Sequence, residues 1–166
     1  MGVSVTRGER LSGFASYTLQ AAVFGTDLML PSRFHPLADD TEIHVAEGSS
    51  LPGIPLHSAK FGVAARLASR LDTGFTVKAQ SSAYLRGDEA NALLPIAGLA
   101  IADALARYRL SDRLSLLAQV TNLFDSQSYT FGVLGEATLL DDDLERARFY
   151  SPVAPRAAWV GIDIKF

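Results

Sequence analysis

Three histidines and three acidic residues are the side chains whose chemistry first points to a metal site. They fall in or beside one long polar segment: His35, His44, His57, Asp39, Asp40 and Glu42. Imidazole nitrogens and carboxylate oxygens are ordinary metal ligands. Their spacing fits no standard ligand pattern, however. We therefore expect solvated loop histidines, and the sequence predicts neither a metal nor a cofactor.

Two further charged stretches invite a binding interpretation. Arg86–Asp88 is an Arg-Gly-Asp tripeptide, a cell-adhesion sequence in other settings, but it falls in YLRGDEAN, and we interpret it as a polar entry to a loop. The second stretch is a charge run, which we expect to be a solvated outer loop, with a contact to a cation or to lipopolysaccharide as the alternative. Its residues are Asp141, Asp142, Asp143, Glu145, Arg146 and Arg148.

Catalytic chemistry finds no support in the sequence. There is no nucleophile elbow, no phosphate-binding glycine loop and no paired histidine and carboxylate motif. Cysteine is absent, which excludes disulfides, thiol catalysis and cysteine metal sites. The 166 residues carry a formal net charge of -3 and no basic stripe, so nucleic acid is not an expected partner. We predict that the chain is not an enzyme.

Strands must position these residues, because apolar side chains recur with a period of two along most of the chain. Such alternation places successive side chains on opposite faces of a strand. The Ala-rich stretch at 101–110 also permits a helix, but its apolar spacing is two and tight turns join it to strands on both sides. We predict about seven strands, at residues 2–7, 13–25, 58–67, 73–85, 98–110, 114–132 and 156–166.

The connections between these strands alternate in length. Short turns near Glu9, Ser69 and Asp112 alternate with long segments at 26–56, 86–97 and 134–154 that are rich in Pro, Gly and Asp. Strands that cross a membrane up and down, with tight turns on one side and long loops on the other, give this pattern. A count of seven requires residues 114–132 to form one long, kinked strand that passes through NLFD without reversing.

The two faces of the predicted sheet differ in chemistry. The apolar set contains many alanines, whereas the core of a soluble sandwich would favour larger side chains. In a membrane barrel the charged set would face a wet lumen and the apolar set would face lipid. A soluble antiparallel sheet is the alternative. Trp159 falls in the inward set, where we expect it to pack in the lumen unless a bulge moves it to the interface. The charged members of the inward set are Lys60, Arg66, Lys78, Asp103, Arg107, Asp163 and Lys165.

Several motifs occur in a specific order along the chain. LPGIP leads into a strand, NLFD ends an alternating strand, SYTFG follows it, and PRAAWVGIDIKF closes the chain. In these motifs and their order, residues 1–166 resemble the C-terminal part of the barrel of TonB-dependent outer-membrane receptors. The family motif maps onto Asn122, Leu123, Phe124, Asp125 and Tyr129.

The resemblance implies a function and a location. Receptors of this family import iron-siderophore complexes or other scarce nutrients across the bacterial outer membrane, through a 22-stranded barrel with a plug domain inside. In outer-membrane barrels the alternating residues that end in a C-terminal aromatic are read by the assembly machinery, and Phe166, Ile164 and Ile162 match that pattern. Implied partners are outer-membrane lipid, the barrel-assembly machinery, and the rest of the receptor barrel with its plug.

The chain departs from this family in size. Seven strands without a plug cannot enclose a siderophore, so we expect a C-terminal barrel fragment that does not transport by itself. Alone it would be a curved sheet with two unpaired edges. The alternatives are a soluble antiparallel β-sheet binding module and a small barrel formed by self-association.

Overall fold

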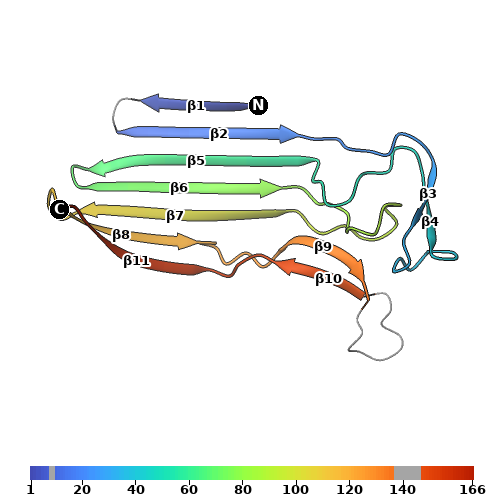
Figure 1. Cartoon of the computed structure of the whole chain (residues 1–166). Coiled ribbons are helices and arrows are strands. Elements are labelled where there is room, and N and C mark those ends of the chain that lie inside the picture. Colours follow the sequence, from blue (N-terminus) through green and yellow to red (C-terminus); the bar gives the residue numbers. More distant parts are fainter. Residues whose placement is uncertain (8–9, 137–146) are drawn as a thin grey trace.

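One antiparallel sheet dominates the computed structural model, which describes residues 1–7, 10–136 and 147–166 (Figure 1). Its seven strands pair in the order β1-β2-β5-β6-β7-β8-β11. This result confirms the predicted all-β meander of about seven strands. The described residues include no helix long and apolar enough to cross a membrane. The strands are Gly2–Arg7 (β1), Leu11–Leu19 (β2), His57–Ala68 (β5), Leu71–Gln80 (β6), Leu99–Arg109 (β7), Leu114–Thr121 (β8) and Ala157–Ile164 (β11).

Two small hairpins lie at the long-loop end of the sheet. Leu28–Pro31 (β3) pairs with Glu42–Val45 (β4), and Tyr129–Gly135 (β9) pairs with Ala147–Pro152 (β10). Figure 1 places both hairpins at the end of the sheet opposite the tight turns. The β3–β4 hairpin was not predicted, because strands of four residues are too short for alternation to be recognised.

The long sixth strand of the prediction is divided in two. The chain runs from β8 into β9 without reversing, as predicted, but pairing stops between Thr121 and Tyr129 (Figure 1). Asn122 and Asp125 have φ angles of 48° and 54°, in the left-handed region. A strand cannot continue through such backbone, so the NLFD motif ends the ladder.

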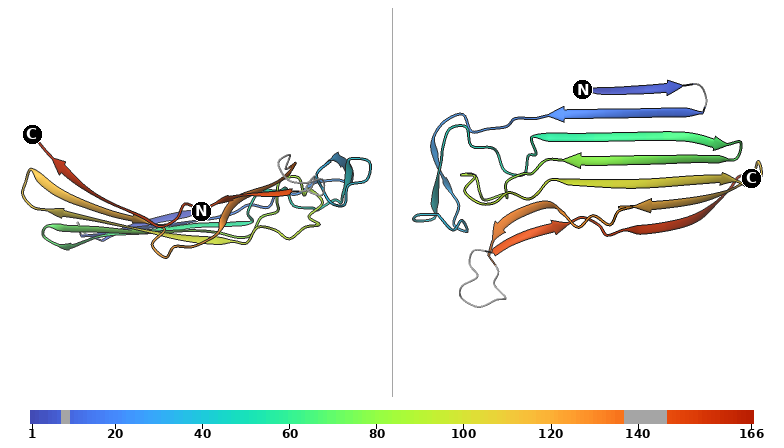
Figure 2. Two further views of the ribbon diagram at one scale, coloured as in Figure 1. Left: turned by 90° about the horizontal axis from the view of Figure 1, so that it is seen from below. Right: turned by 180° about the vertical axis from the view of Figure 1, so that it is seen from behind.

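The large sheet is a single curved layer with very little core of its own. Figure 2 shows β8 and β11 bending out of the plane in which β5 and β6 lie. Of the buried hydrophobic side chains in the described residues, only Ala102 belongs to this sheet. The others, Ile43, Val45, Leu85 and Leu134, lie at the long-loop end. Burial of apolar side chains therefore stabilises the loops, while strand pairing holds the sheet.

A buried hydrogen bond between His35 and Asp88 anchors the loop core. The side chains of His35 and Asp88 are both 0% exposed, and His35 Nε2 lies 3.0 Å from Asp88 Oδ1. The Leu37 N–H donates to His35 Nδ1 at 3.1 Å, so Nε2 carries the proton and donates to Asp88. Asp88 also accepts the N–H groups of Ala92 and Leu93, at 2.9 and 3.0 Å.

This hydrogen bond corrects one expectation and explains the Arg-Gly-Asp tripeptide. The expectation of a solvated histidine is wrong for His35, because its partner lies 53 residues further along the chain and spacing could not reveal it. His44 and His57 are exposed, as expected, but they lie in β4 and β5 and not in loops. Asp88 is fully buried, so the tripeptide cannot present its carboxylate to another molecule. Across residues 1–7, 10–136 and 147–166, no three potential metal ligands cluster.

Candidate functional site

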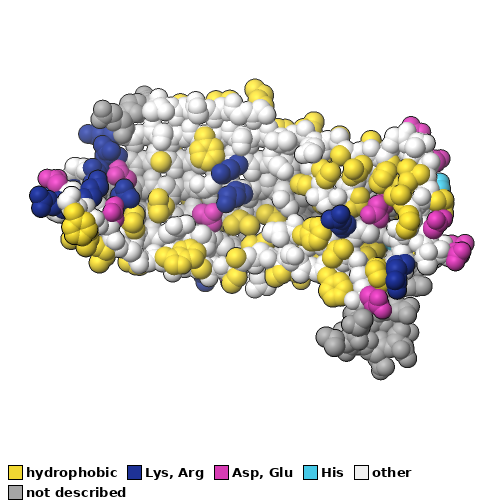
Figure 3. Space-filling view, viewed as in Figure 1, with side chains coloured by type: hydrophobic (Ala, Val, Ile, Leu, Met, Phe, Trp, Pro, Cys, Tyr) yellow, Lys and Arg dark blue, Asp and Glu magenta, His cyan; other side chains and the backbone are white. Residues whose placement is uncertain are grey.

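The charged residues of the sheet share one face. Strand register sets Lys60 beside Lys78, and Arg66 beside Asp72, so their side chains project on the same side. Figure 3 looks onto this side and shows lysines and an acidic side chain near the middle and a cluster of charges at the tight-turn end. We call it the charged face. In β2, β5, β6, β7, β8 and β11 it carries Lys60, Arg66, Asp72, Lys78, Asp103, Arg107, Arg109 and Asp163.

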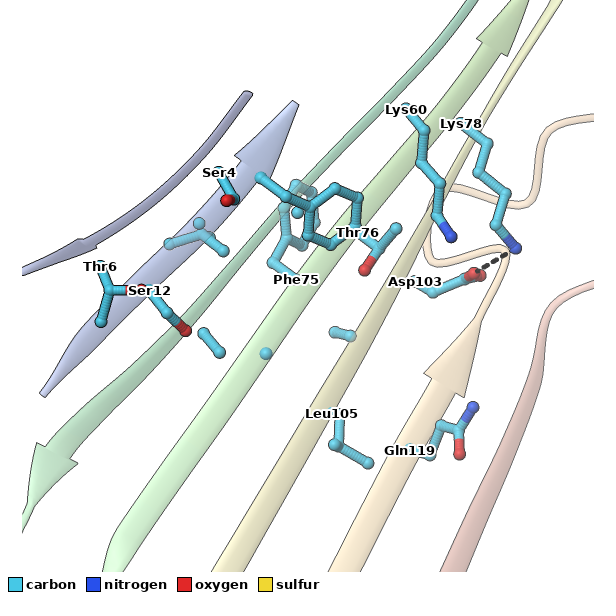
Figure 4. A pocket seen from close by; sticks show the side chains of 17 residues that line it. Ser4, Thr6, Ser12, Lys60, Phe75, Thr76, Lys78, Asp103, Leu105 and Gln119 are labelled. Atoms are coloured by element: carbon cyan, nitrogen blue, oxygen red, sulfur yellow. Dashed lines mark ion pairs between the residues drawn. The ribbon is translucent and has the colours of Figure 1, made fainter. Parts of the chain in front are cut away.

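The charged face is hollowed. A depression of about 560 Å³ extends across it from β1 to β8. Figure 4 shows its labelled lining, with the lysines and Asp103 at one end and small hydroxyl side chains at the other. Phe14 lines it as well, with Lys60 Nζ 5.4 Å from the centre of its ring. The depression is open and wet, and its walls mix apolar, hydroxyl and charged groups.

Ion pairs join neighbouring strands at the tight-turn end of the charged face. Arg66 Nε lies 3.0 Å from Asp72 Oδ1, and an Arg109 nitrogen lies 3.1 Å from Asp72 Oδ2. Arg107 reaches across β8 to Asp163 at 3.6 Å. These side chains are partly exposed, so each pair stabilises the sheet only modestly. Together they join β5, β6, β7 and β11 at this end of the charged face.

The opposite face of the sheet has none of these charges. Within the same six strands it carries no Lys, Arg, Asp or Glu, and we call it the apolar face. Its side chains are exposed: Val160 is 81% and Ile162 65% accessible. Soluble monomers rarely expose an apolar surface of this extent. A sheet with one apolar and one charged face suits a wall between hydrocarbon and water.

The NLFD motif forms a joint between the large sheet and the β9–β10 hairpin. Asn122 is 3% exposed, and its Nδ2 donates to the carbonyls of Ser126 and Ala154, at 3.1 and 3.0 Å. Its Oδ1 accepts the Ser126 N–H at 2.8 Å. Asp125 Oδ1 accepts the Arg156 N–H at 3.0 Å. The motif thus ties the outgoing strand to the returning one, at the place where both leave the sheet.

No protein-family model and no curated protein matches the sequence. Solved structures do. The chain matches the siderophore receptor PiuA from Acinetobacter baumannii over 99% of its own length and 21% of that chain, with a TM-score of 0.75 and 15% identity. It matches the ferric yersiniabactin uptake receptor FyuA from Yersinia pestis over 98% and 22%, with a TM-score of 0.68 and 17% identity. For the copper transporter OprC the shares are 99% and 23%, the TM-score 0.60 and the identity 19%.

The chain has the fold of part of a TonB-dependent receptor barrel. It spans about a fifth of the length of the structures it matches. The fold that the sequence resemblance implied is confirmed, and we refer to the chain below as the barrel segment. The proteins it matches are receptors and transporters rather than enzymes.

In the barrel segment, the remaining residues of the family motif take different positions. The N–H of Leu123 donates to the Ala102 carbonyl at 2.7 Å, which fastens the joint to β7. Phe124 is 72% exposed. The ring of Tyr129 packs on that of Tyr150, with centroids 4.7 Å apart. Sequence reasoning found these residues through the resemblance but did not predict that Asn122 bonds to the returning strand.

We expect Asn122→Ala to loosen this joint. The substitution removes three hydrogen bonds of a buried side chain and forces alanine into a φ of 48°, at a cost of about 2–4 kcal/mol in the free energy of unfolding. Urea unfolding of the segment refolded in lipid vesicles measures this change. Asn122→Asp, which keeps the acceptor and tolerates the backbone, should lose less. Equal stability of Asn122→Ala and the wild type would contradict the role of this side chain.

The C-terminal residues lie on the apolar face. Ile162 is opposite Leu116, and Ile164 is opposite Leu114. Phe166 follows the end of β11 and is fully exposed. An assembly role for these three residues stays a prediction. Trp159 is opposite Gln119 on the charged face, which agrees with its expected place in the inward set. Residues 141–146 of the predicted outer loop lie outside the described residues.

Proposed function

We propose that the barrel segment is the C-terminal part of the wall of an outer-membrane receptor that takes up siderophore-bound iron or a similar scarce nutrient in a TonB-dependent manner. The separation of the charges of β2, β5, β6, β7, β8 and β11 onto one concave face carries this proposal. In such a receptor the apolar face contacts lipid and the charged face lines the lumen. The solute class is taken from the siderophore and metal transporters that share the fold.

The segment acts as part of a larger barrel in this proposal. In the described residues, β1 and β11 each pair with a strand on one side only. Open edges leave unpaired backbone groups, and each of these costs free energy in hydrocarbon unless another strand pairs with it. Further strands of a receptor barrel would pair with both edges, and a plug would occupy the concave side. By itself the segment does not transport.

In this proposal the C-terminal residues are the signal that the barrel-assembly machinery recognises. Phe166, Ile164 and Ile162 present an aromatic residue and alternate aliphatic residues on the lipid side of the last strand. The barrel-assembly machinery would read this edge and insert the wall into the outer membrane. The aromatic ring then lies at the inner interface, with the terminal carboxylate in water.

The single tryptophan provides a test of which face meets lipid. Trp159 lies on the charged face and Val160 on the apolar face, one position apart on β11. The segment is refolded in vesicles that contain phosphatidylcholine with brominated acyl chains, which quench tryptophan on contact. We expect weak quenching of Trp159. A double variant, Trp159→Phe with Val160→Trp, should be quenched strongly.

Acrylamide in the aqueous phase serves as the complementary probe. It should quench Trp159 strongly and the tryptophan of the double variant weakly. Equal lipid quenching at the two positions, or stronger quenching of Trp159, would overturn the proposed wall. So would a monomer that stays soluble without lipid or detergent, because that behaviour belongs to a soluble β-sheet module.

A further inference from the structure

Two lysines lie directly opposite one another on the charged face. Lys60 on β5 and Lys78 on β6 are register partners. Figure 4 shows their side chains extending from adjacent strands in the same direction, with Asp103 close by. Like charges at opposed positions of neighbouring strands destabilise a sheet. An anion that offsets the second ammonium group would therefore stabilise the arrangement.

The nearby carboxylate does not provide that offset. Asp103 Oδ2 lies 3.6 Å from Lys78 Nζ, and Oδ1 accepts the N–H of Asn122 at 3.0 Å. Both oxygens are thus already engaged. Lys60 has no carboxylate within ion-pair distance in the described part of the chain, and its Nζ lies over the ring of Phe14 instead. One ammonium group at this place lacks a counter-charge.

The charged face as a whole repeats this imbalance. Its paired strands carry five cationic side chains and three carboxylates, an excess of two positive charges, on a chain whose formal net charge is -3. A concave wall with an excess of one sign attracts and orients a partner of the other sign. The occupant of the concave side should consequently present carboxylates to it.

The size and lining of the depression indicate what kind of anion fits. At about 560 Å³ it is far larger than the roughly 30 Å³ that one water molecule occupies in the liquid. Its lining combines hydroxyl and amide groups of Ser12, Thr76 and Gln119 with the apolar surface of Phe14 and Leu105. Backbone amides and side chains of a polypeptide match such a mixture, whereas a small ion would use only the lysines.

We propose that this depression binds an acidic polypeptide segment, one carboxylate of which is held between Lys60 and Lys78. The proposal rests on the proposed function, because that function turns the charged face toward the lumen. It adds the chemistry of the contact. The carboxylate of a glutamate or aspartate accepts hydrogen bonds from both ammonium groups, and the ring of Phe14 packs against the methylene groups of that side chain. Charge-assisted hydrogen bonds of this kind are about twice as strong as neutral ones.

The three lysines of the chain allow a direct test. Reductive methylation with ¹³C-formaldehyde labels Lys60, Lys78 and Lys165 while keeping their charge, and each gives its own NMR signal. The full chain is placed in lipid nanodiscs and titrated with a short synthetic peptide that has glutamates at alternate positions. We expect the Lys60 and Lys78 signals to shift together and to saturate, while the Lys165 signal stays in place.

A control peptide and two lysine variants show whether binding depends on the carboxylates and on Lys60. A peptide with glutamine for glutamate should bind at least about tenfold more weakly, as should the Lys60→Met chain with the glutamate peptide, because each loses a charge-assisted hydrogen bond. The Lys165→Met chain should bind as the wild type does. Equal binding of the two peptides, or an equal shift at Lys165, would overturn the proposal. Saturation by acetate at the same concentration would overturn the polypeptide as the ligand.

Trp159 separates a failure of this inference from a failure of the proposed function. In the same nanodiscs, weak quenching of Trp159 by brominated lipid shows that the charged face is in water. Weak quenching with no saturable lysine shift would reject the carboxylate site and leave the barrel wall intact. Strong quenching would reject the wall itself.

Discussion

Val160→Lys should prevent stable insertion of the barrel segment into lipid. Val160 lies near the middle of β11 on the apolar face and is 81% exposed, so its side chain would contact hydrocarbon. A lysine on the lipid face of a barrel costs about 2–4 kcal/mol at the bilayer midplane. We expect a loss of most of the vesicle-bound folded fraction, measured by flotation and by heat-modifiable migration in electrophoresis.

The neighbouring position supplies the control. Gly161 lies on the charged face, and a Cβ built on it meets no other atom within 4 Å. Gly161→Lys adds the same charge to the same strand but directs it toward the wet side. We expect folding in vesicles close to that of the wild type. If both substitutions were tolerated, or both were disruptive, the assignment of lipid and lumen faces would be wrong.

Asp88→Ala should release the loop core while leaving the sheet paired. The substitution leaves the buried His35 Nε2 and the partly buried N–H groups of Ala92 and Leu93 without an acceptor. A buried donor that is left without an acceptor costs about 1–3 kcal/mol. Hydrogen exchange should therefore accelerate in residues 32–45 and 85–93, with little change in β5 and β6.

Exposed acids of the same loops show whether charge alone matters. Glu47→Ala removes a carboxylate from an exposed position of the first long loop and should leave exchange unchanged. Asp88→Asn retains an oxygen for His35 and Ala92 but places an amide against the Leu93 N–H, so its effect should be intermediate. Exchange in Asp88→Ala that matched the wild type would show that the buried pair does not hold the loops.

Alternation along the sequence determined the large sheet correctly. Alternation with a period of two predicts which residues share a face of a strand. This inference does not depend on which strand lies opposite. It placed Lys60, Arg66 and Asp163 on one side and Ile162 on the other, as the register does. The alternation of short and long connections determined the order of strands, because a tight turn leaves the next strand no place except beside the last.

The loops were beyond this kind of reasoning. Residues 26–56 were predicted to be a long polar connection, whereas β3, β4 and His35 contribute to the only cluster of buried residues that the structure describes away from the sheet. Loop segments have no periodicity that predicts burial. The partner of His35 is 53 residues away, and the second bond of Asn122 joins it to Ala154, 32 residues away.

The sequence by itself therefore determined the strands, their order and the chemistry of the two faces, because these follow from local spacing. Only the tertiary structure decided which side chains face one another across strands and between loops. The opposition of Lys60 and Lys78 depends on the register between β5 and β6, and the His35–Asp88 pair on how two loops pack. Contacts between distant residues depend on where the chain returns, and spacing along the chain does not contain that information.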